Sequence, residues 1–200
     1  MNPELPPLCV SCSIFRREIE ELRASGRLDL PVHFLDSMLH MVPAKLESTL
    51  QESLDAIRAA DPDRKVVIAY GDCCGHMETY ESRPGTARTE GINCCEIILG
   101  REAYRRLRKE GVFFLMPEWT LAWKDVFVEQ LGLLGPNAKT FMREMHTRLV
   151  YLDTGLVPVP HGTLREASEF LGLPYEIMNV PLDFLLASLK QAASFARAHG

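Results

Sequence analysis

The sequence lacks long apolar runs, dense basic clusters and low-complexity tracts, and each absence excludes a class of protein. Polar residues interrupt every apolar run well before the roughly 20 residues that a membrane helix needs, so no membrane partner is expected. No dense Lys/Arg run occurs and the net charge is −5, so binding to nucleic acid is disfavoured. Residues 1–10 show no basic stretch followed by a long apolar one, which predicts no secretory signal and a cytoplasmic protein.

The common nucleotide-binding and catalytic motifs are also missing. Neither GxGxxG nor a Walker sequence occurs, so nucleotide binding has no positive support. HExxH and GxSxG are absent, and standard zinc-protease and esterase chemistry is therefore unsupported.

The sequence does have the composition of a globular domain. Of its 200 residues, 46% are hydrophobic and 24% are charged. This length is sufficient to bury a core without disulfides or metal ions as staples. Because no linker or internal repeat interrupts the chain, we expect a single domain over residues 1–200.

Patterns typical of strands and helices alternate along the chain. Short apolar runs predict strands at residues 8–14, 30–36, 64–70, 112–116, 148–155 and 174–180. Amphipathic stretches predict helices at residues 15–26, 43–60, 95–111, 118–133, 136–147, 163–172 and 181–198. This alternation is typical of α/β proteins. We therefore expect a three-layer αβα sandwich with a mainly parallel sheet of five or six strands.

A polar segment at residues 71–91 follows the clearest strand. It is too polar for the core and too long for a simple turn, which predicts a functional loop that covers a site. Its Arg83 and Arg88 could hold an anionic group, although exposed arginines on loops are usually only solvated.

Six cysteines occur as three close couples, namely Cys9 with Cys12, Cys73 with Cys74, and Cys94 with Cys95. A disulfide framework is not expected in a chain of this size without an export signal. In a reducing compartment, clustered thiols indicate a metal ion, an iron–sulfur cluster or redox chemistry. The plain alternative is that some are small buried residues, since free cysteine is among the most buried residue types.

The positions of these cysteines suggest one common site. In an open parallel sheet the ligand crevice lies at the carboxyl ends of the strands. Cys12 ends the first predicted strand, His40 follows the second, and Cys73 and Cys74 follow the third. Cys94 and Cys95 begin a helix, so all three couples could converge on one edge of the sheet.

Six stretches of the chain form a recognisable set, namely the strand that ends at Cys12, SMLHMVPAKL at 37–46, YGDCCG at 70–75, INCCEIILG at 92–100, PEWTLAW at 117–123 and YLDTGL at 151–156. Together they resemble an uncharacterised bacterial and archaeal family, domain of unknown function 1638. The resemblance assigns the family's three cysteines to Cys12, Cys73 and Cys94. It matches His40 to a Leu-His pair and Trp119 to a Gly-Trp pair.

This resemblance also marks two departures and implies a setting. Asn93 stands where the family usually has Asp, and Glu118 where it usually has Gly. The family suggests anaerobic one-carbon metabolism and corrinoid methyl transfer, with a small molecule or a methyl-transfer protein as partner. It implies no established reaction.

Three interpretations follow from these residues. The leading one is a metal ion or iron–sulfur cluster bound by Cys12, Cys73 and Cys94, with His40 as a ligand or as a group that orients a thiolate. Soft thiolates select zinc, copper(I) or iron–sulfur clusters. His76 could supply the fourth ligand instead of His40, and Cys74 or Cys95 could replace its neighbour. Cys9 points to the opposite face of its strand and is expected in the core.

The second interpretation is metal-free thiol redox chemistry or a cysteine nucleophile, with Cys73 beside Cys74 and near His76. The third is a metal carrier or accessory protein without catalytic activity. Enzyme and carrier would share the same ligands, so only turnover distinguishes them.

Overall fold

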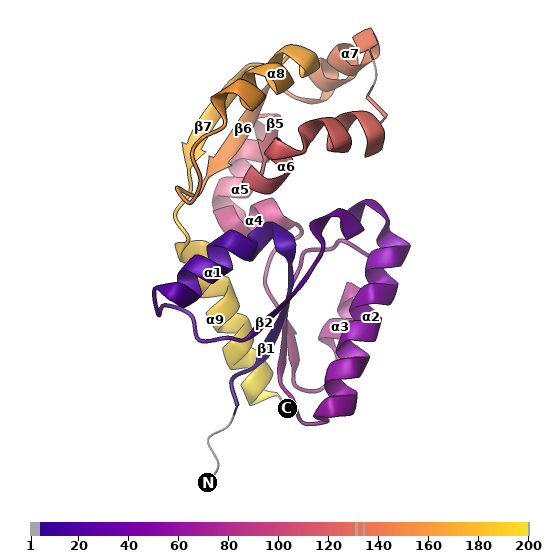
Figure 1. The fold of residues 1–200 in the computed structure, drawn as a ribbon, viewed down its shortest axis with the longest axis vertical. Helices are drawn as coiled ribbons and strands as arrows, with labels where there is room; N and C mark the ends of the chain where they lie inside the picture. The colour runs from indigo at the N-terminus through magenta and orange to yellow at the C-terminus, as the bar shows by residue number, and fades with distance from the viewer. Residues whose placement is uncertain (1–4, 131, 134, 200) are drawn as a thin grey trace. The chain divides into compact units, whose positions relative to one another are not determined.

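The computed structural model describes residues 5–130, 132–133 and 135–199, and its ribbon is drawn in Figure 1. The chain divides into two compact units, Met1–Gly100 with Leu182–Gly200, and Arg101–Pro181. Each unit has a parallel sheet, so the predicted α/β class is confirmed. One sheet of five or six strands in a three-layer sandwich is not confirmed, because the described strands pair into separate sheets of four and three. A single domain over residues 1–200 stays a prediction.

The first unit is built on a four-stranded sheet in the order β2-β1-β3-β4, with every pair parallel. Its strands are β1 (Leu8–Cys12), β2 (Val32–Leu35), β3 (Val66–Ala69) and β4 (Thr86–Arg88). Its helices are α1 (Arg16–Ala24), α2 (Pro43–Ala60), α3 (Met77–Glu81), α4 (Cys94–Leu99) and α9 (Asp183–Ala198), with short 3-10 helices η1 (Ser13–Phe15) and η2 (Ser37–Met41). All four residues of β3 are buried, as expected for a strand covered on both faces.

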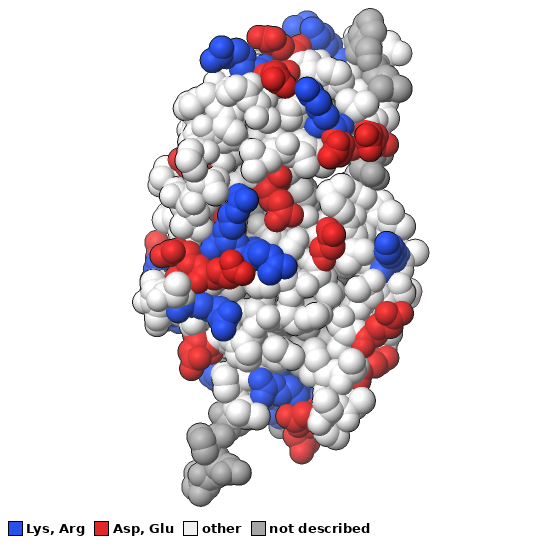
Figure 2. Space-filling model, viewed as in Figure 1, with Lys and Arg blue, Asp and Glu red and all other residues white. Residues whose placement is uncertain are grey.

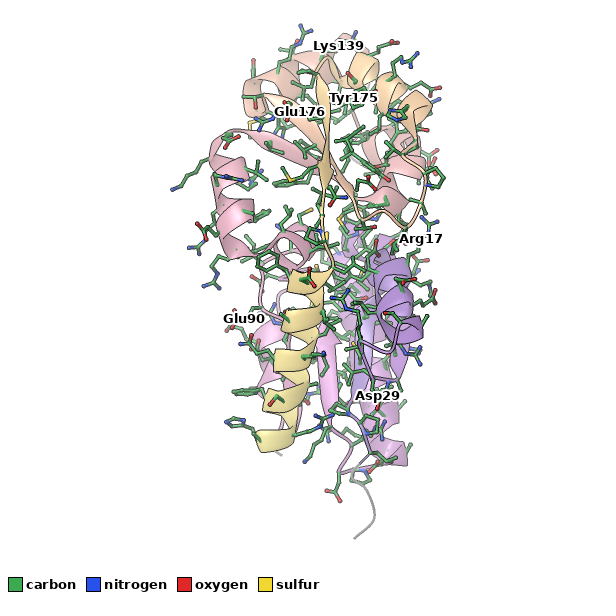
Figure 3. The ribbon with its side chains drawn as sticks, turned by 90° about the vertical axis from the view of Figure 1, so that its left-hand side faces the viewer. Arg17, Asp29, Glu90, Lys139, Tyr175 and Glu176 are labelled. Carbon is green, nitrogen blue, oxygen red and sulfur yellow. The ribbon has the colours of Figure 1, made fainter. Side chains whose placement is uncertain are left out.

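Helices cover both faces of this sheet. Figure 1 shows α2 and α3 on one side of the strands and α1 and α9 on the other. The last helix, α9, comes from the far end of the chain and packs against β3 and β4. Figure 3 shows Glu90 beside α9, where Gln191 donates a hydrogen bond of 3.0 Å to the Glu90 carboxylate. The carboxyl terminus therefore completes the unit in which the cysteines lie.

The second unit holds a three-stranded parallel sheet in the order β5-β6-β7. Its elements are β5 (Val112–Leu115), β6 (Arg148–Asp153), β7 (Tyr175–Asn179), α5 (Arg101–Lys109), α6 (Pro117–Leu121), η3 (Asp125–Gln130), α7 (Gly135–Met145) and α8 (His161–Leu171). Its core joins the sheet to helices through residues such as Trp123, Leu149 and Leu164. At the edge strand β7, where Figure 3 labels Glu176, the Arg148 guanidinium donates to the Glu176 carboxylate at 2.9 Å.

Three predicted segments differ from the structure. The polar segment 71–91 is not a single loop, because it contains α3 and the sheet strand β4. The predicted helix 95–111 is two helices, since Gly100 between them has a φ of +78° and a Cβ there would lie 2.8 Å from the Phe184 ring. The predicted helix 118–133 divides into α6 and the π-helix η3, and its residue 131 lies outside the described residues.

The surface charge and the helices of the described residues agree with two expectations from the sequence, namely the lack of a basic cluster and the lack of a membrane helix. On the face of the first unit seen in Figure 2, acidic and basic side chains are interspersed rather than gathered by sign. None of the helices in the described part of the chain combines the length and the apolar character that a membrane crossing requires.

Candidate functional site

Cys12 and Tyr70 are neighbours at the carboxyl edge of the four-stranded sheet. The parallel register pairs Ser11 of β1 with Ala69 of β3. The next residue of each strand is therefore Cys12 on one side and Tyr70 on the other, and paired positions of neighbouring strands face the same side of a sheet. Both side chains are buried, with exposures of 8% and 2%.

The Tyr70 hydroxyl occupies the space between groups from three strand ends. Burial raises its pKa, and the nearby Cys12 thiol, Cys73 thiol and Asp36 carboxylate raise it further. The hydroxyl oxygen is sealed from solvent and makes no well-formed hydrogen bond, although the Cys12 sulfur lies within its reach. A buried hydroxyl without a proper acceptor is uncommon in folded proteins and calls for an explanation.

Gly71 permits a close approach between two segments that carry cysteines. The Asp72 amide donates a hydrogen bond of 2.9 Å to the Ile92 carbonyl. A Cβ at Gly71 would lie 2.4 Å from the Cα of Asn93, well inside any real contact. Only glycine fits there, and the contact brings the residues after Gly71 beside the start of α4.

Across this junction the Cys94 thiol is close enough to Cys73 to affect its ionisation. Burial raises the pKa of Cys73 to about 11, with the Cys94 thiol as the next cause. The Cys95 thiol, whose sulfur lies 4.0 Å from that of Cys94, and then burial raise the pKa of Cys94 well above its usual range. At neutral pH these thiols are protonated, so neither is an activated nucleophile in this arrangement.

The segments on both sides of the junction are held by polar contacts. Asn93 caps α4, its side-chain oxygen accepting from the Glu96 amide at 3.0 Å. Next to Cys73, the Asp72 carboxylate accepts from the Arg88 guanidinium at 2.6 Å, and Arg88 also binds Glu81 at 3.0 Å. Arg88 therefore ties the Cys73 segment to β4, and it serves protein carboxylates rather than the external anion that the sequence suggested.

Cys9 and Cys74 have different surroundings from those of Cys73 and Cys94. Cys9 is fully buried in the core, as predicted, and burial raises its pKa to about 12. Burial also raises the pKa of Cys74, whose neighbours are Glu47, Arg88 and the backbone of His76 rather than Cys94. His76 itself binds the Glu47 carboxylate at 2.7 Å. The thiols of Cys73 and Cys74 act on each other, but their other neighbours differ.

His40 lies in η2, which directly follows β2 at the same edge of the sheet. Its Nδ1 lies 2.5 Å from the Ser37 carbonyl oxygen, which can only accept, so Nδ1 carries the proton. In the neutral ring this places the lone pair on Nε2, the atom that histidine commonly offers to metals. The preceding Asp36 caps η2 by accepting from the Met38 amide at 2.8 Å.

The predicted site residues belong to two sheets. Cys12, Cys73 and Cys94 lie at the carboxyl edge of the first unit's sheet, whereas Trp119 follows a strand of the second unit's sheet. Within the described residues, no group of three or more His, Cys, Asp and Glu side chains is gathered closely enough to hold a metal ion. The ligand roles of Cys12, Cys73, Cys94 and His40 therefore stay predictions.

Neither Tyr70 nor the ion pair of Asp72 with Arg88 was predicted from the sequence. A signal for Tyr70 was present, because it directly follows the strongest strand, where parallel sheets place ligands. The partner of Arg88 had no such signal, since it depends on β4, which was not predicted.

Comparison with known families gives one match. A family model described as "Protein of unknown function (DUF1638)" matches residues 34–189, which include His40, Cys73 and Cys94 but not Cys12. No curated protein and no solved structure matches the chain.

Proposed function

This chain belongs to that family of proteins of unknown function, and on this premise we propose that it binds a thiophilic metal ion or an iron–sulfur cluster. The ligands in this proposal are the thiolates of Cys12, Cys73 and Cys94, with Nε2 of His40 as a fourth ligand or an orienting group. The observation that carries it is the junction at Gly71, which joins two cysteine-bearing segments beside the strand end of Cys12.

The chemistry of the donor set supports a soft cation. Buried thiols that disfavour each other's ionisation stay protonated until a positive charge compensates them. A metal ion supplies that charge, and thiolate sulfur prefers zinc, copper(I) or iron–sulfur clusters over hard cations. The same raised pKa values of Cys73 and Cys94 disfavour a metal-free thiolate nucleophile at neutral pH.

Binding in this proposal is coupled to a local movement. The thiols of the described structure are not gathered into a metal group, so loss of their protons and attraction to one cation would have to draw them together. The backbone junction at Gly71 limits that movement to side chains and the short segment 72–75. Cys74 has Glu47 and Arg88 as its charged neighbours, so the proposal takes Cys73 rather than Cys74 as the ligand.

The partner class follows from the number of ligands. With His40 as the orienting group, three thiolates leave a coordination position for a small molecule, and a thiophilic metal binds a small thiol there as its thiolate. A metal-bound thiolate is a nucleophile that can accept a methyl group, so we propose a small thiol or a methyl-transfer protein of one-carbon metabolism as partner.

The test is anaerobic purification followed by metal analysis and an absorption spectrum. We expect the wild type to retain zinc, iron or copper, or to take it up on anaerobic reconstitution. Cys12→Ser, Cys73→Ser and Cys94→Ser should each lower the bound metal severalfold or more, because each removes one of the few protein ligands.

Cys74→Ser is the matched control, since it alters the residue next to Cys73, and the other neighbours of Cys74 differ from those of Cys73. It should retain the wild-type metal content and spectrum. A wild type that takes up none of these metals, unchanged content in all three ligand variants, or equal loss in Cys74→Ser would each contradict the proposal.

A further inference from the structure

We infer that Tyr70 is a positioning residue of the metal site, whose hydroxyl donates a hydrogen bond to the Cys12 or Cys73 thiolate when the metal is bound. This inference rests on the proposed function and adds to it a residue that makes no bond to the metal. The hydrogen bond from Tyr70 would orient the cysteine ligand and lower the electron density on its sulfur.

The position of Tyr70 is set by the sheet. The register of β1 with β3 brings the residue after Ala69 beside Cys12. Cys73 follows three residues later, after the backbone has turned at Gly71 towards Asn93. The hydroxyl therefore has sulfur neighbours from two segments, and the ring is buried with an exposure of 2%.

Among the described residues, the Tyr70 hydroxyl has only a weak acceptor, the Cys12 sulfur. Its oxygen is sealed from solvent and makes no well-formed hydrogen bond. A neutral thiol is only a weak acceptor, so the contact with Cys12 compensates little of the cost of burial.

Metal binding would change this neighbour from a thiol to a thiolate. A charged sulfur is a much stronger acceptor than a neutral one, and charge-assisted hydrogen bonds are about twice as strong as neutral ones. The unfavourable burial of the Tyr70 hydroxyl in the metal-free protein then becomes a favourable contact in the metal-bound protein. Residues that act on ligands in this way typically change metal affinity by about 10–100-fold.

Tyr70→Phe tests the inference because it removes one oxygen and keeps the ring. With Co²⁺ as the probe, we expect the affinity to fall by about 10-fold or more. The thiolate-to-cobalt charge-transfer band should move to lower energy, because the sulfur loses a hydrogen bond. Without metal, the variant should be as stable as the wild type or more stable in urea unfolding, since an unsatisfied hydroxyl is gone.

Tyr80→Phe is the matched control. Tyr80 is a buried tyrosine of the same segment, and its hydroxyl donates to the Glu47 carbonyl at 3.3 Å, beside Cys74 rather than Cys73. It should leave the cobalt affinity and band energy unchanged.

The outcomes separate the inference from the proposed function. A wild type that binds no Co²⁺ would overturn both. A wild type that binds Co²⁺, with Tyr70→Phe giving the same affinity and the same band energy, would overturn the inference alone. A Tyr70→Phe protein that is destabilised without metal and has an unchanged cobalt band would assign Tyr70 to packing and would also overturn it.

Discussion

Cysteines that are close together in the sequence of this chain have different surroundings in the structure. Cys73 and Cys74 are adjacent, yet the Cys94 thiol raises the pKa of the first, whereas Glu47 and Arg88 act on the second. Cys9 and Cys12 belong to one strand, yet an odd separation turns them to opposite faces and leaves Cys9 in the core. At the residue scale, the site is therefore defined by the direction of each side chain.

Cys9 carries a prediction about pH. Its pKa is raised to about 12 by burial, while a thiol in the unfolded chain ionises near pH 8.5. Above about pH 9 the unfolded state thus releases a proton that the folded state keeps, so the unfolding free energy falls as pH rises. The expected slope is at most about 1.4 kcal/mol per pH unit for this thiol, and it vanishes below about pH 8.

Urea unfolding between pH 8 and 10.5 measures this slope. Cys9→Ala lowers stability at every pH but should make its decline above pH 9 shallower, because one of the ionising thiols has been removed. Equal slopes for the wild type and Cys9→Ala would show that Cys9 does not contribute.

Ion pairs and hydrogen bonds between secondary-structure elements hold the segment that carries Cys73. β4 is only three residues long, but its Arg88 binds Asp72, next to Cys73, and Glu81 at the end of α3. Arg83, five residues earlier, instead binds Gln51 and Asp55 on α2. Two arginines of the same segment therefore anchor it to different elements, and only Arg88 acts beside a proposed ligand.

Arg88→Gln should weaken metal binding more than it weakens the fold. Loss of the Asp72 tie loosens the Cys73 segment, and we expect the Co²⁺ affinity to fall by about 10-fold. Because Asp72 and Glu81 are about half exposed, the loss of stability should be no more than about 1 kcal/mol. A cobalt titration and urea unfolding of the same samples measure both quantities.

Arg83→Gln is the control for this experiment, because it removes a tie of the same segment to α2. Its cobalt affinity should equal that of the wild type. If both arginine variants lose affinity equally, the segment as a whole matters and the specific tie of Arg88 to Asp72 does not.

The molecule as a whole consists of two units with separate sheets, and the first is closed by the last helix of the chain. Leu189 of α9 is fully buried in the first unit, and Leu164 of α8 is fully buried in the core of the second. Replacing either leucine by alanine removes similar apolar volume and is expected to cost about 2–5 kcal/mol in its own unit. The matched pair therefore probes whether the units unfold separately.

Labelling of Cys9 by a thiol reagent reports on opening of the first unit, because this thiol is fully buried there. In a Cys12→Ser background, mass spectrometry can follow Cys9 alone in its peptide. We expect Leu189→Ala to accelerate labelling by 10-fold or more and Leu164→Ala to leave it near the wild-type rate. Equal acceleration by both variants would instead support one cooperative domain over residues 1–200.

The sequence by itself determined the α/β class, most strand positions and the family. β3, α2 and β6 follow from apolar runs and helical periodicity, because these patterns reflect whether one or both faces of an element are buried. The three cysteine couples stood out from spacing alone. The position of His40 directly after β2 was also predictable from the sequence, because the end of a strand can be recognised from the local residue pattern alone.

Only the tertiary structure decided which strands share a sheet and which thiols meet. β4 is too short and polar to give a strand pattern, and it exists through its pairing with β3. The electrostatic influence of Cys94 on Cys73 depends on the approach of Gly71 to Asn93. Contacts between residues distant in the chain are selected by packing and hydrogen bonding of the whole unit, and local periodicity carries no record of them.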